Sequence, residues 1–394
     1  MVDTGCSKLP DGWSAGTFQD VLDGFTSGAT PRRNRAEHYG GNIKWVTSGE
    51  LNYQVICDTH EKITKVGMEK TNLKLLKPGA FLMAITGLEA AGTRGRCAIL
   101  GVEATTNQSC MALLSTTRMS TSYVLHYYIF RGNQLAFEYC QGTKQQSYTG
   151  RIVKKLPIVY PLEIIEQEAI ATALTDIDNL IQSLEKLIDK KRQIKQGAMQ
   201  QLLTGVKRLP GFCGEWAAKR IGDLFEIYAG GDLDVENYSG FVTDKHRYPI
   251  YSNGLVNKGI YGFSACYDHL GNSITVTARG TIGHADYRSQ AFCAIGRLLV
   301  LKPRVELDNS MISETINACL EFAIESTGVP QLTAPQIAKY DIYIPNDYHE
   351  QRAIAQVLSS MDSEIESLEH KLEKLKAIKQ GMMQELLTGR IRLI

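Results

Sequence analysis

Apolar residues recur at alternating steps of four and three along two stretches of this chain. In the first stretch they are Ile170, Leu174, Ile177, Ile181, Leu184 and Ile188. In the second they are Ile354, Leu358, Met361, Ile365, Leu368, Leu372 and Leu375. A mean spacing of about 3.5 residues is typical of a coiled-coil seam. The pattern therefore predicts two amphipathic helices of about 40 residues, each roughly 60 Å long.

The two predicted helices are copies of one unit. The stretch from Glu166, EQEAIATALTDIDNLIQSLEKLIDKKRQIKQGAMQQLLTGVKRL, matches the stretch from Glu350, EQRAIAQVLSSMDSEIESLEHKLEKLKAIKQGMMQELLTGRIRL, at a constant offset of 184 residues. The alignment has no gap, and about half of the positions are identical. Each copy ends at a Thr-Gly pair, which contains Gly205 or Gly389 and stops a helix well.

Two matched seams in one chain can bury each other. We expect this intramolecular pairing, with the helices antiparallel and the halves related by an approximate two-fold axis; the alternative is a zipper between two copies of the chain. Gly197 and Gly381 interrupt both helices at the same place. A glycine there costs about 1 kcal/mol relative to alanine, so its presence in both copies indicates either a close helix approach or a bend.

The segment before each predicted helix has a different pattern from the helices. Both contain short β-type runs, such as AFLMAITG and SITVTARG, separated by glycine-rich turns. Their ends correspond loosely, but their middles do not align. We expect a mixed α/β (α+β) chain: a first domain in 1–160, a helical spacer in 161–205, a second domain in 206–345 and a helical spacer in 346–394.

The amino-acid composition excludes few classes of protein. The 394 residues are 43% hydrophobic and 22% charged, with a net charge of +1. There is no apolar run of membrane-spanning length, no secretory leader pattern and no CxxC pair, so we expect a cytoplasmic protein without a zinc site. A near-neutral charge still permits nucleic-acid binding when basic faces are offset by acidic helices.

Motifs for catalysis are missing from the sequence. There is no Pro-Pro for an adenine-methyltransferase loop, no GxxxxGK[ST] phosphate loop and no HExxH metal motif. No carboxylate pair fits a nuclease pattern either. The sequence favours a binding role over an enzyme.

Several motifs together resemble the specificity subunit of type I restriction-modification enzymes. They are Glu-Gln at the start of each long helix, KQGxMQxLLTG at each helix end, TSGATPRR in 26–33, NIKWVTSGELN from Asn42, TTNQSCMALL around Asn107 and PQLTAPQIAKYDIYIP before the second helix. The resemblance covers essentially the whole chain, and the helix motifs are specific as a pair.

This resemblance implies a non-catalytic subunit that binds double-stranded DNA. Each domain would read one half of a bipartite site, and the helices would set the gap. One such subunit would bind two methyltransferase subunits and, in the full complex, two restriction subunits. S-adenosylmethionine, ATP and Mg²⁺ would belong to those partners, and this chain would hold no cofactor. The alternatives are the recognition subunit of another two-part enzyme and a coiled-coil adaptor that binds protein.

Candidate DNA contacts in the first domain are basic or amide side chains in loops. They are Arg32, Arg33 and Arg35 after a proline, Arg94 and Arg96 around a glycine, Asn107 and Gln108, and Lys144 and Gln145. Arginine grips phosphate or guanine, and an amide pairs with adenine. Each set has an ordinary structural alternative, which is a solvated turn, a surface hairpin or a buried amide.

The second domain offers a similar set of candidates. They are Lys245 and Arg247 in a basic turn, Ser252 and Asn253 in a loop, Arg279 in TARGTIG, and Gln331. Arg279 can fork onto guanine or pair with a carboxylate of the protein. We expect Trp45 and Trp216 to anchor cores rather than to stack on bases.

Overall fold

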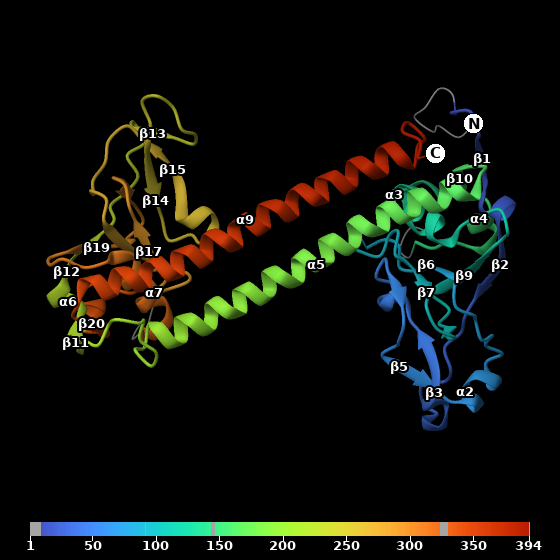
Figure 1. Cartoon of the computed structure of the whole chain (residues 1–394), viewed down its shortest axis with the longest axis horizontal. Coiled ribbons are helices and arrows are strands. Elements are labelled where there is room, and N and C mark those ends of the chain that lie inside the picture. The colour runs from blue at the N-terminus through green and yellow to red at the C-terminus, as the bar shows by residue number, and fades with distance from the viewer. Residues whose placement is uncertain (1–8, 91, 143–145, 324–329, 394) are drawn as a thin grey trace. The chain divides into compact units, whose positions relative to one another are not determined.

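The computed structural model describes residues 9–90, 92–142, 146–323 and 330–393. By its contacts the chain divides into two units, which are described separately (Figure 1). Unit 1 contains residues 1–184 and 371–394, and unit 2 contains residues 185–370. Each unit therefore combines one globular part with a portion of both long helices.

Unit 1 has a globular part built on a five-stranded sheet. Its helices are α1 (Phe18–Val21), η1 (Ala36–His38), η2 (Ser48–Glu50), α2 (Lys65–Lys70), α3 (Thr121–Tyr139) and α4 (Gly150–Lys154), followed by α5 (Ile164–Leu202). Its strands are β1 (Trp13–Thr17), β2 (Leu22–Ser27), β3 (Tyr39–Val46), β4 (Val55–Ile56), β5 (Glu61–Ile63), β6 (Phe81–Ala84), β7 (Cys97–Leu100), β8 (Thr105–Thr106), β9 (Cys110–Ser115) and β10 (Pro157–Pro161). They pair in the orders β2-β9-β6-β7-β4, β5-β3-β8 and β1-β10.

The core of unit 1 lies between the large sheet and α3. Strands β6 and β7 are buried along their whole length, as continuous apolar runs in a covered strand require. Tyr128 of α3 is fully buried and meets Phe81 edge to face, with ring centroids 5.7 Å apart. The three-stranded sheet carries Trp45, which is only 1% exposed. The prediction that Trp45 anchors a core is confirmed.

Unit 2 has two four-stranded sheets. Its helices are α6 (Ile221–Leu224), η3 (Val256–Gly259), α7 (Asn309–Cys319) and α8 (Ala334–Ile337), followed by α9 (Tyr348–Leu386). Its strands are β11 (Trp216–Arg220), β12 (Phe225–Ala229), β13 (Tyr238–Ser239), β14 (Tyr248–Tyr251), β15 (Ile260–Ser264), β16 (Ser273–Val276), β17 (Ala285–Arg288), β18 (Cys293–Ala294), β19 (Leu299–Pro303) and β20 (Asp341–Pro345). They pair in the orders β12-β19-β16-β17, β13-β15-β14-β18 and β11-β20. The main core packs α7 against β16 and β17.

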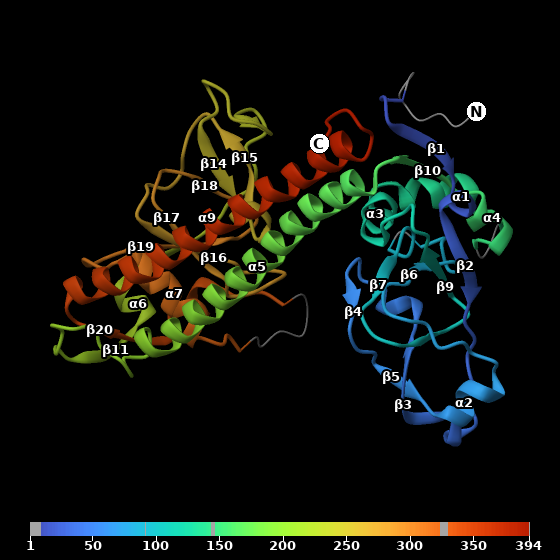
Figure 2. The same cartoon turned by 45° about the vertical axis from the view of Figure 1, so that its right-hand side comes forward.

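Helices α5 and α9 pair antiparallel within each unit (Figures 1 and 2). In unit 1, Lys379 Nζ lies 2.6 Å from Asp178 Oδ1. In unit 2, Lys191 pairs with Glu364 and the later Lys195 pairs with the earlier Asp362, both at 2.6 Å. The seam buries all six apolar positions predicted in α5, from Ile170 to Ile188. In α9 it buries Ile354, Leu358 and Ile365, while the other four predicted positions, Met361, Leu368, Leu372 and Leu375, are partly exposed. The prediction of two mixed α/β domains with two long, intramolecularly paired helices is confirmed.

The Glu-Gln at each helix start is buried and joins the helix to its own domain. Gln167 donates through Nε2 to the Pro161 carbonyl at 2.8 Å and accepts at Oε1 from Ser120 N, also at 2.8 Å. Gln351 repeats this by donating to the Pro345 carbonyl at 2.8 Å. The amide thereby fixes the angle at which each helix leaves the strand before it.

The glutamate before each of these glutamines forms an ion pair with an arginine that follows the other long helix. Glu166 and Glu350 are both fully buried. Arg392, which follows α9, donates from Nη2 to Glu166 Oε2 at 2.7 Å in unit 1. Arg208, which follows α5, donates to Glu350 Oε2 at 2.5 Å in unit 2. Each carboxylate raises the pKa of its arginine. In each unit the ion pair thereby attaches the end of one long helix to the start of the other.

The glycines in the helices have two distinct environments. Gly205 and Gly389 adopt left-handed φ values of 71° and 75° and pack on the rings of Trp216 and Trp13. A Cβ at Gly197 or Gly381 would meet no atom within 4 Å. The alternative that these two glycines allow a close approach between helices of this chain is therefore wrong.

Membrane insertion has no support in the helices. Within 9–90, 92–142, 146–323 and 330–393, none of them combines the length and the apolar character that a span needs.

Candidate nucleic-acid interface

Three of the motifs singled out in the first domain meet around Trp45 in unit 1. Trp45 donates from Nε1 to the Ala29 carbonyl at 3.1 Å. Ala29 N donates to the Thr106 carbonyl at 3.1 Å, and the Thr30 hydroxyl donates to Gln108 Oε1. The loop TSGATPRR and the turn TTNQS are thus one surface, although almost 80 residues separate Thr30 from Gln108.

Gly28 makes this approach possible. A Cβ at Gly28 would lie 1.7 Å from the Thr106 carbonyl oxygen, closer than any real Cβ contact. The glycine is therefore required by backbone packing. It lets the loop that carries the predicted arginines lie directly against the Thr106 backbone.

The three arginines of this loop differ in whether their side chains already have partners within the protein. Arg33 forms a two-pronged contact with Glu61, at 2.6 and 2.8 Å, and its guanidinium lies 4.8 Å from the centroid of the Tyr39 ring. The pKa of Glu61 is lowered by this arginine. Arg32 and Arg35 are exposed, and their side chains have no hydrogen-bond or ion-pair partner in the described parts of the chain. Arg32 and Arg35 are thus the side chains that remain available to a ligand.

Arg94 and Arg96 are tied to their own loop. Arg94 donates from Nε to the Leu88 carbonyl at 2.6 Å, and Arg96 donates from Nε to the Gly92 carbonyl at 2.5 Å. Gly95 between them, with φ at 72°, approaches the backbone of α3. The close approach that a glycine here allows is made to a helix of the protein, while DNA contact by the two arginines stays a prediction.

The remaining first-domain candidates divide in the same way. Asn107 accepts from Ser109 N at 3.1 Å and so closes its own turn. Gln108 is exposed and faces the arginine loop through Thr30. Lys144 and Gln145 lie outside the residues that the structure describes.

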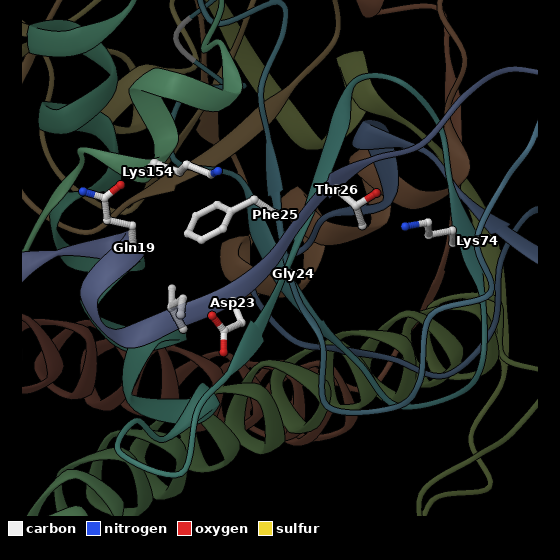
Figure 3. Close-up of a pocket in the computed structure, with 8 residues that line it drawn as sticks. Gln19, Asp23, Gly24, Phe25, Thr26, Lys74 and Lys154 are labelled. Atoms are coloured by element: carbon white, nitrogen blue, oxygen red, sulfur yellow. The ribbon is translucent and has the colours of Figure 1, made fainter.

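An open pocket of about 430 Å³ lies beside β2, where its pairing with β9 shifts register (Figure 3). Lys74 and Lys154 point toward the strand from opposite sides, with Phe25 and Thr26 between them. Lys154 Nζ is 5.6 Å from the Phe25 ring centroid. Two cations about a shallow hollow suit a phosphate group. No local sequence pattern indicates this site, because only the fold brings Lys74 and Lys154 to the same pocket.

In unit 2 the structure brings three predicted residues together. Arg279 donates from Nη2 and Nε to Gln331 Oε1, at 2.8 and 3.1 Å. Asn253 Oδ1 accepts from Arg279 N at 3.3 Å and from Ala278 N at 2.7 Å. Arg279 is exposed and pairs with an amide instead of a carboxylate, so its charge is not neutralised by this contact.

The basic turn of unit 2 is a compact structure. Thr243 N donates to the His246 carbonyl at 3.1 Å, and Arg247 donates from Nη2 to the Asp244 carbonyl at 2.7 Å. Lys245 at its tip is exposed and has no partner in the part of the chain described. Ser252 is half-buried, and its backbone N donates to the carbonyl of residue 259 at 2.9 Å.

One buried cation was not anticipated from the sequence. Arg288 of β17 is 5% exposed; it pairs with Asp286 at 3.0 Å and lies 3.7 Å from the Tyr251 ring centroid. Burial lowers the pKa of this guanidinium. Its partners make it a core residue that joins the two sheets of unit 2. Strand β17 has only four residues, too few for the sequence pattern to indicate that this arginine is buried.

The comparisons with known proteins agree on one family. The model of the type I restriction modification DNA specificity domain matches residues 10–196 and 214–377. The MjaIX specificity subunit of a type I restriction enzyme from Methanocaldococcus jannaschii is 23% identical, over 99% of this chain and 96% of that protein. The MjaVIII specificity subunit from the same organism is 26% identical, over 60% of this chain and 62% of its own length.

Solved structures show the same fold. The S subunit of a type I restriction-modification system from M. genitalium has a TM-score of 0.66 at 15% identity and covers 96% of this chain and 97% of its own. The S subunit from Thermoanaerobacter tengcongensis has a TM-score of 0.53 at 16% identity, covering 98% and 99%.

Proposed function

The chain belongs to the family of type I restriction-modification DNA specificity domains, and from this we propose that each unit reads one half of a bipartite DNA site. The supporting observation is the division of the chain into repeated and non-repeated parts. The helices, their buried Glu-Gln and the arginine that closes each unit recur 184 residues apart. The predicted DNA contacts lie in the globular domains, whose ends correspond only loosely and whose middles do not align.

In unit 1 we assign phosphate and base contacts to different residues. Arg32 and Arg35 are exposed and have no side-chain partner among the described residues, and Gln108 lies on the same surface. Lys74 and Lys154 flank the pocket on β2 and would hold a backbone phosphate. Gln108 offers an amide for adenine, and the arginines suit guanine or phosphate. Arg33 would act mainly by holding the loop, since Glu61 occupies its guanidinium.

In unit 2 the equivalent group is Arg279 with Gln331. The amide oxygen of Gln331 fixes the guanidinium through two hydrogen bonds and leaves it exposed. A positioned guanidinium is suited to the two acceptors on the major-groove edge of guanine. Lys245 would supply a phosphate contact from the neighbouring turn.

The helices would space the two readers and dock methyltransferase subunits. Their exposed faces carry an isoleucine at equivalent positions, Ile194 and Ile378, which are 47% and 53% exposed and lie three residues before the open Gly197 and Gly381. Equivalent apolar positions on both copies fit two copies of one partner. Restriction subunits would join this complex, and S-adenosylmethionine, ATP and Mg²⁺ would bind to the partners. We assign no catalytic step to this chain and place it in the cytoplasm.

Methylome sequencing tests the proposal. A host that expresses this chain with its methyltransferase should acquire one bipartite methylated motif. Purified chain with that partner should bind a duplex carrying the motif, and scrambling either half should weaken binding by at least 10³-fold. Affinity that does not depend on the DNA sequence or on salt would instead support a protein-binding adaptor. Turnover by the chain alone would show that it is an enzyme.

Lys74 and Lys154 give a sharper test of the unit 1 surface. Each phosphate contact adds about 0.9 to the slope of log affinity against log salt. Lys74→Gln with Lys154→Gln should therefore lower that slope by about two and weaken binding to specific and unrelated DNA alike. Lys65→Gln with Lys70→Gln, exposed lysines outside the pocket, is the matched control.

A further inference from the structure

The loop of residues 239–247 in unit 2, here called the apolar loop, holds large apolar side chains in solvent. Phe241 is 83% exposed and Val242 is 63% exposed. Phe241 is the most exposed large apolar residue in the described part of the chain. Exposure of this extent on a neighbouring pair of residues indicates a surface that meets another molecule.

The loop is built to keep these side chains outside. Ser239 donates from Oγ to the Phe241 carbonyl at 2.7 Å, and Phe241 N donates back to the same hydroxyl at 3.2 Å. On the other side, Thr243 and His246 close a turn through three hydrogen bonds, of 2.9 to 3.1 Å. A preorganised loop loses little conformational entropy when it binds.

The charges around the apolar pair favour a polyanion. Lys245 and Arg247 follow within five residues, and both are exposed. Arg247 uses two donors on the Asp244 carbonyl, which leaves its charge uncompensated by that contact. With Asp244 as the one acidic residue, residues 239–247 carry a net charge of +1.

The sequence of the loop lies in the middle of the second domain, which does not align with the first domain. A partner that binds both units alike would use features present in both, such as the long helices. The two units would differ in the DNA half-site that each reads. A loop whose sequence is not repeated therefore fits the half-site better than it fits a shared protein partner.

We propose that Phe241 and Val242 contact the 5-methyl groups of thymine in the major groove, while Lys245 and Arg247 bind the flanking phosphates. Apolar side chains distinguish thymine by this methyl group, which no other base carries in the groove. The proposal rests on the proposed function and adds to it the chemistry of one half-site. Unit 2 would read at least one A·T pair by apolar contact, in addition to any guanine read by Arg279.

Uracil substitution tests this directly. The full chain, bound to its methyltransferase, is titrated with duplexes in which each thymine of the methylated motif is replaced in turn by uracil, which lacks only the methyl group. At one or two positions in one half-site, uracil should weaken binding about fourfold, as expected for one buried methyl. The variant Phe241→Ser with Val242→Thr should bind the normal site about 10- to 100-fold more weakly and lose this sensitivity.

Phe137→Ser is the matched control, because Phe137 of α3 in unit 1 is also highly exposed, at 77%. It should leave the uracil sensitivity unchanged. Sensitivity that survives in the Phe241 variant, or a motif whose uracil duplexes all bind normally, would overturn the proposal while leaving DNA reading intact. Loss of methyltransferase binding by the variant would assign the loop to that subunit. Failure of the unmodified complex to select any DNA sequence would refute the proposed function itself.

Discussion

Gln167 and Gln351 connect the start of each long helix to the domain that precedes it. Gln167 is fully buried and hydrogen-bonds three backbone groups, the carbonyls of Pro161 and Arg118 and the N–H of Ser120. Leaving such groups buried without a partner costs about 1–3 kcal/mol each. One side chain therefore couples the helix to β10 and to the start of α3.

Gln167→Leu should destabilise unit 1 by about 3 kcal/mol, because it keeps the volume but leaves the backbone groups unsatisfied. Gln351→Leu should have an effect of similar size on unit 2. The measurement is urea denaturation followed by hydrogen exchange, which reports each unit separately. Gln380→Leu, at an exposed position of α9 in unit 1, should change stability by less than about 0.5 kcal/mol. Equal effects at positions 167 and 380 would contradict this account.

His126 should make unit 1 sensitive to acid. Its ring is 2% exposed, Nε2 lies 2.9 Å from Thr175 Oγ1, and burial lowers its pKa to about 4. The unfolded chain takes up the proton near pH 6.5, whereas the folded chain resists it. The contribution is therefore complete above about pH 6.5 and is lost as the pH falls toward 4, by roughly 3 kcal/mol in total.

The variant His126→Gln removes the titrating group and should flatten that part of the stability curve. Urea midpoints measured between pH 7 and pH 4.5 would show it. The parent chain should lose more stability over this range than the variant does. Parallel curves for the two proteins would mean that folding does not lower the pKa of His126.

At the residue scale, the sequence indicated which side chains have the chemistry to contact DNA. It did not indicate which of them are already paired within the protein. Arg279 and Gln331 were proposed separately, and their hydrogen bond follows from the loop that Asn253 fixes. Arg33 carries the same local signal as Arg32, but Glu61, which lies 28 residues away, occupies it. Long-range pairing of this kind leaves no local pattern, so a single sequence could not distinguish these arginines.

At the scale of elements, the long helices were the most predictable part of the molecule. Their seam repeats over many turns, and their copies confirm each other. The short strands were recognisable only as β-type runs, since β4, β8, β13 and β18 have two residues each, too few to show a period. Their order in the sheets comes from non-local pairing, which periodicity does not encode.

The open glycines of these helices give a prediction at the same scale. Gly197→Ala and Gly381→Ala introduce no clash, because no atom lies within 4 Å of either new Cβ. Each should stabilise the isolated chain by about 1 kcal/mol through helix propensity alone. Thermal unfolding of the single and double variants would measure this gain.

The same variants test why glycine stands there twice. If a methyltransferase helix packs closely at these positions, the double variant should be more stable alone but should assemble less tightly with that partner. Size-exclusion chromatography of mixed subunits would show the difference. Ser183→Ala, at an exposed position of α5, is the control, and it should leave assembly unchanged. Full assembly by the double variant would mean that the glycines serve no docking role.

At the scale of the whole molecule, the features that recur in both units lie in the long helices and their ends, and the features that differ lie in the globular parts. In each unit the globular part is closed by an arginine that comes from beyond the end of the opposite helix, Arg392 on Glu166 and Arg208 on Glu350. This exchange makes the helices part of both units. The identity of a domain's target can therefore change in the non-repeated loops without altering the contacts that hold the two helices.

The spacing role proposed for the helices predicts how the recognised gap responds to their length. Seven residues inserted after Leu184 in α5, together with seven after His370 in α9, preserve the 3.5-residue seam and add about 10 Å of helix. At 3.4 Å per base pair, the gap in the methylated motif should grow by about three base pairs, with both half-sites unchanged. Insertion in α5 alone breaks the register of the seam, so it should abolish methylation instead of shifting the gap. Methylome sequencing of hosts that carry each variant would decide, and an unchanged gap with the double insertion would show that the distance between the half-sites is not set by the helices.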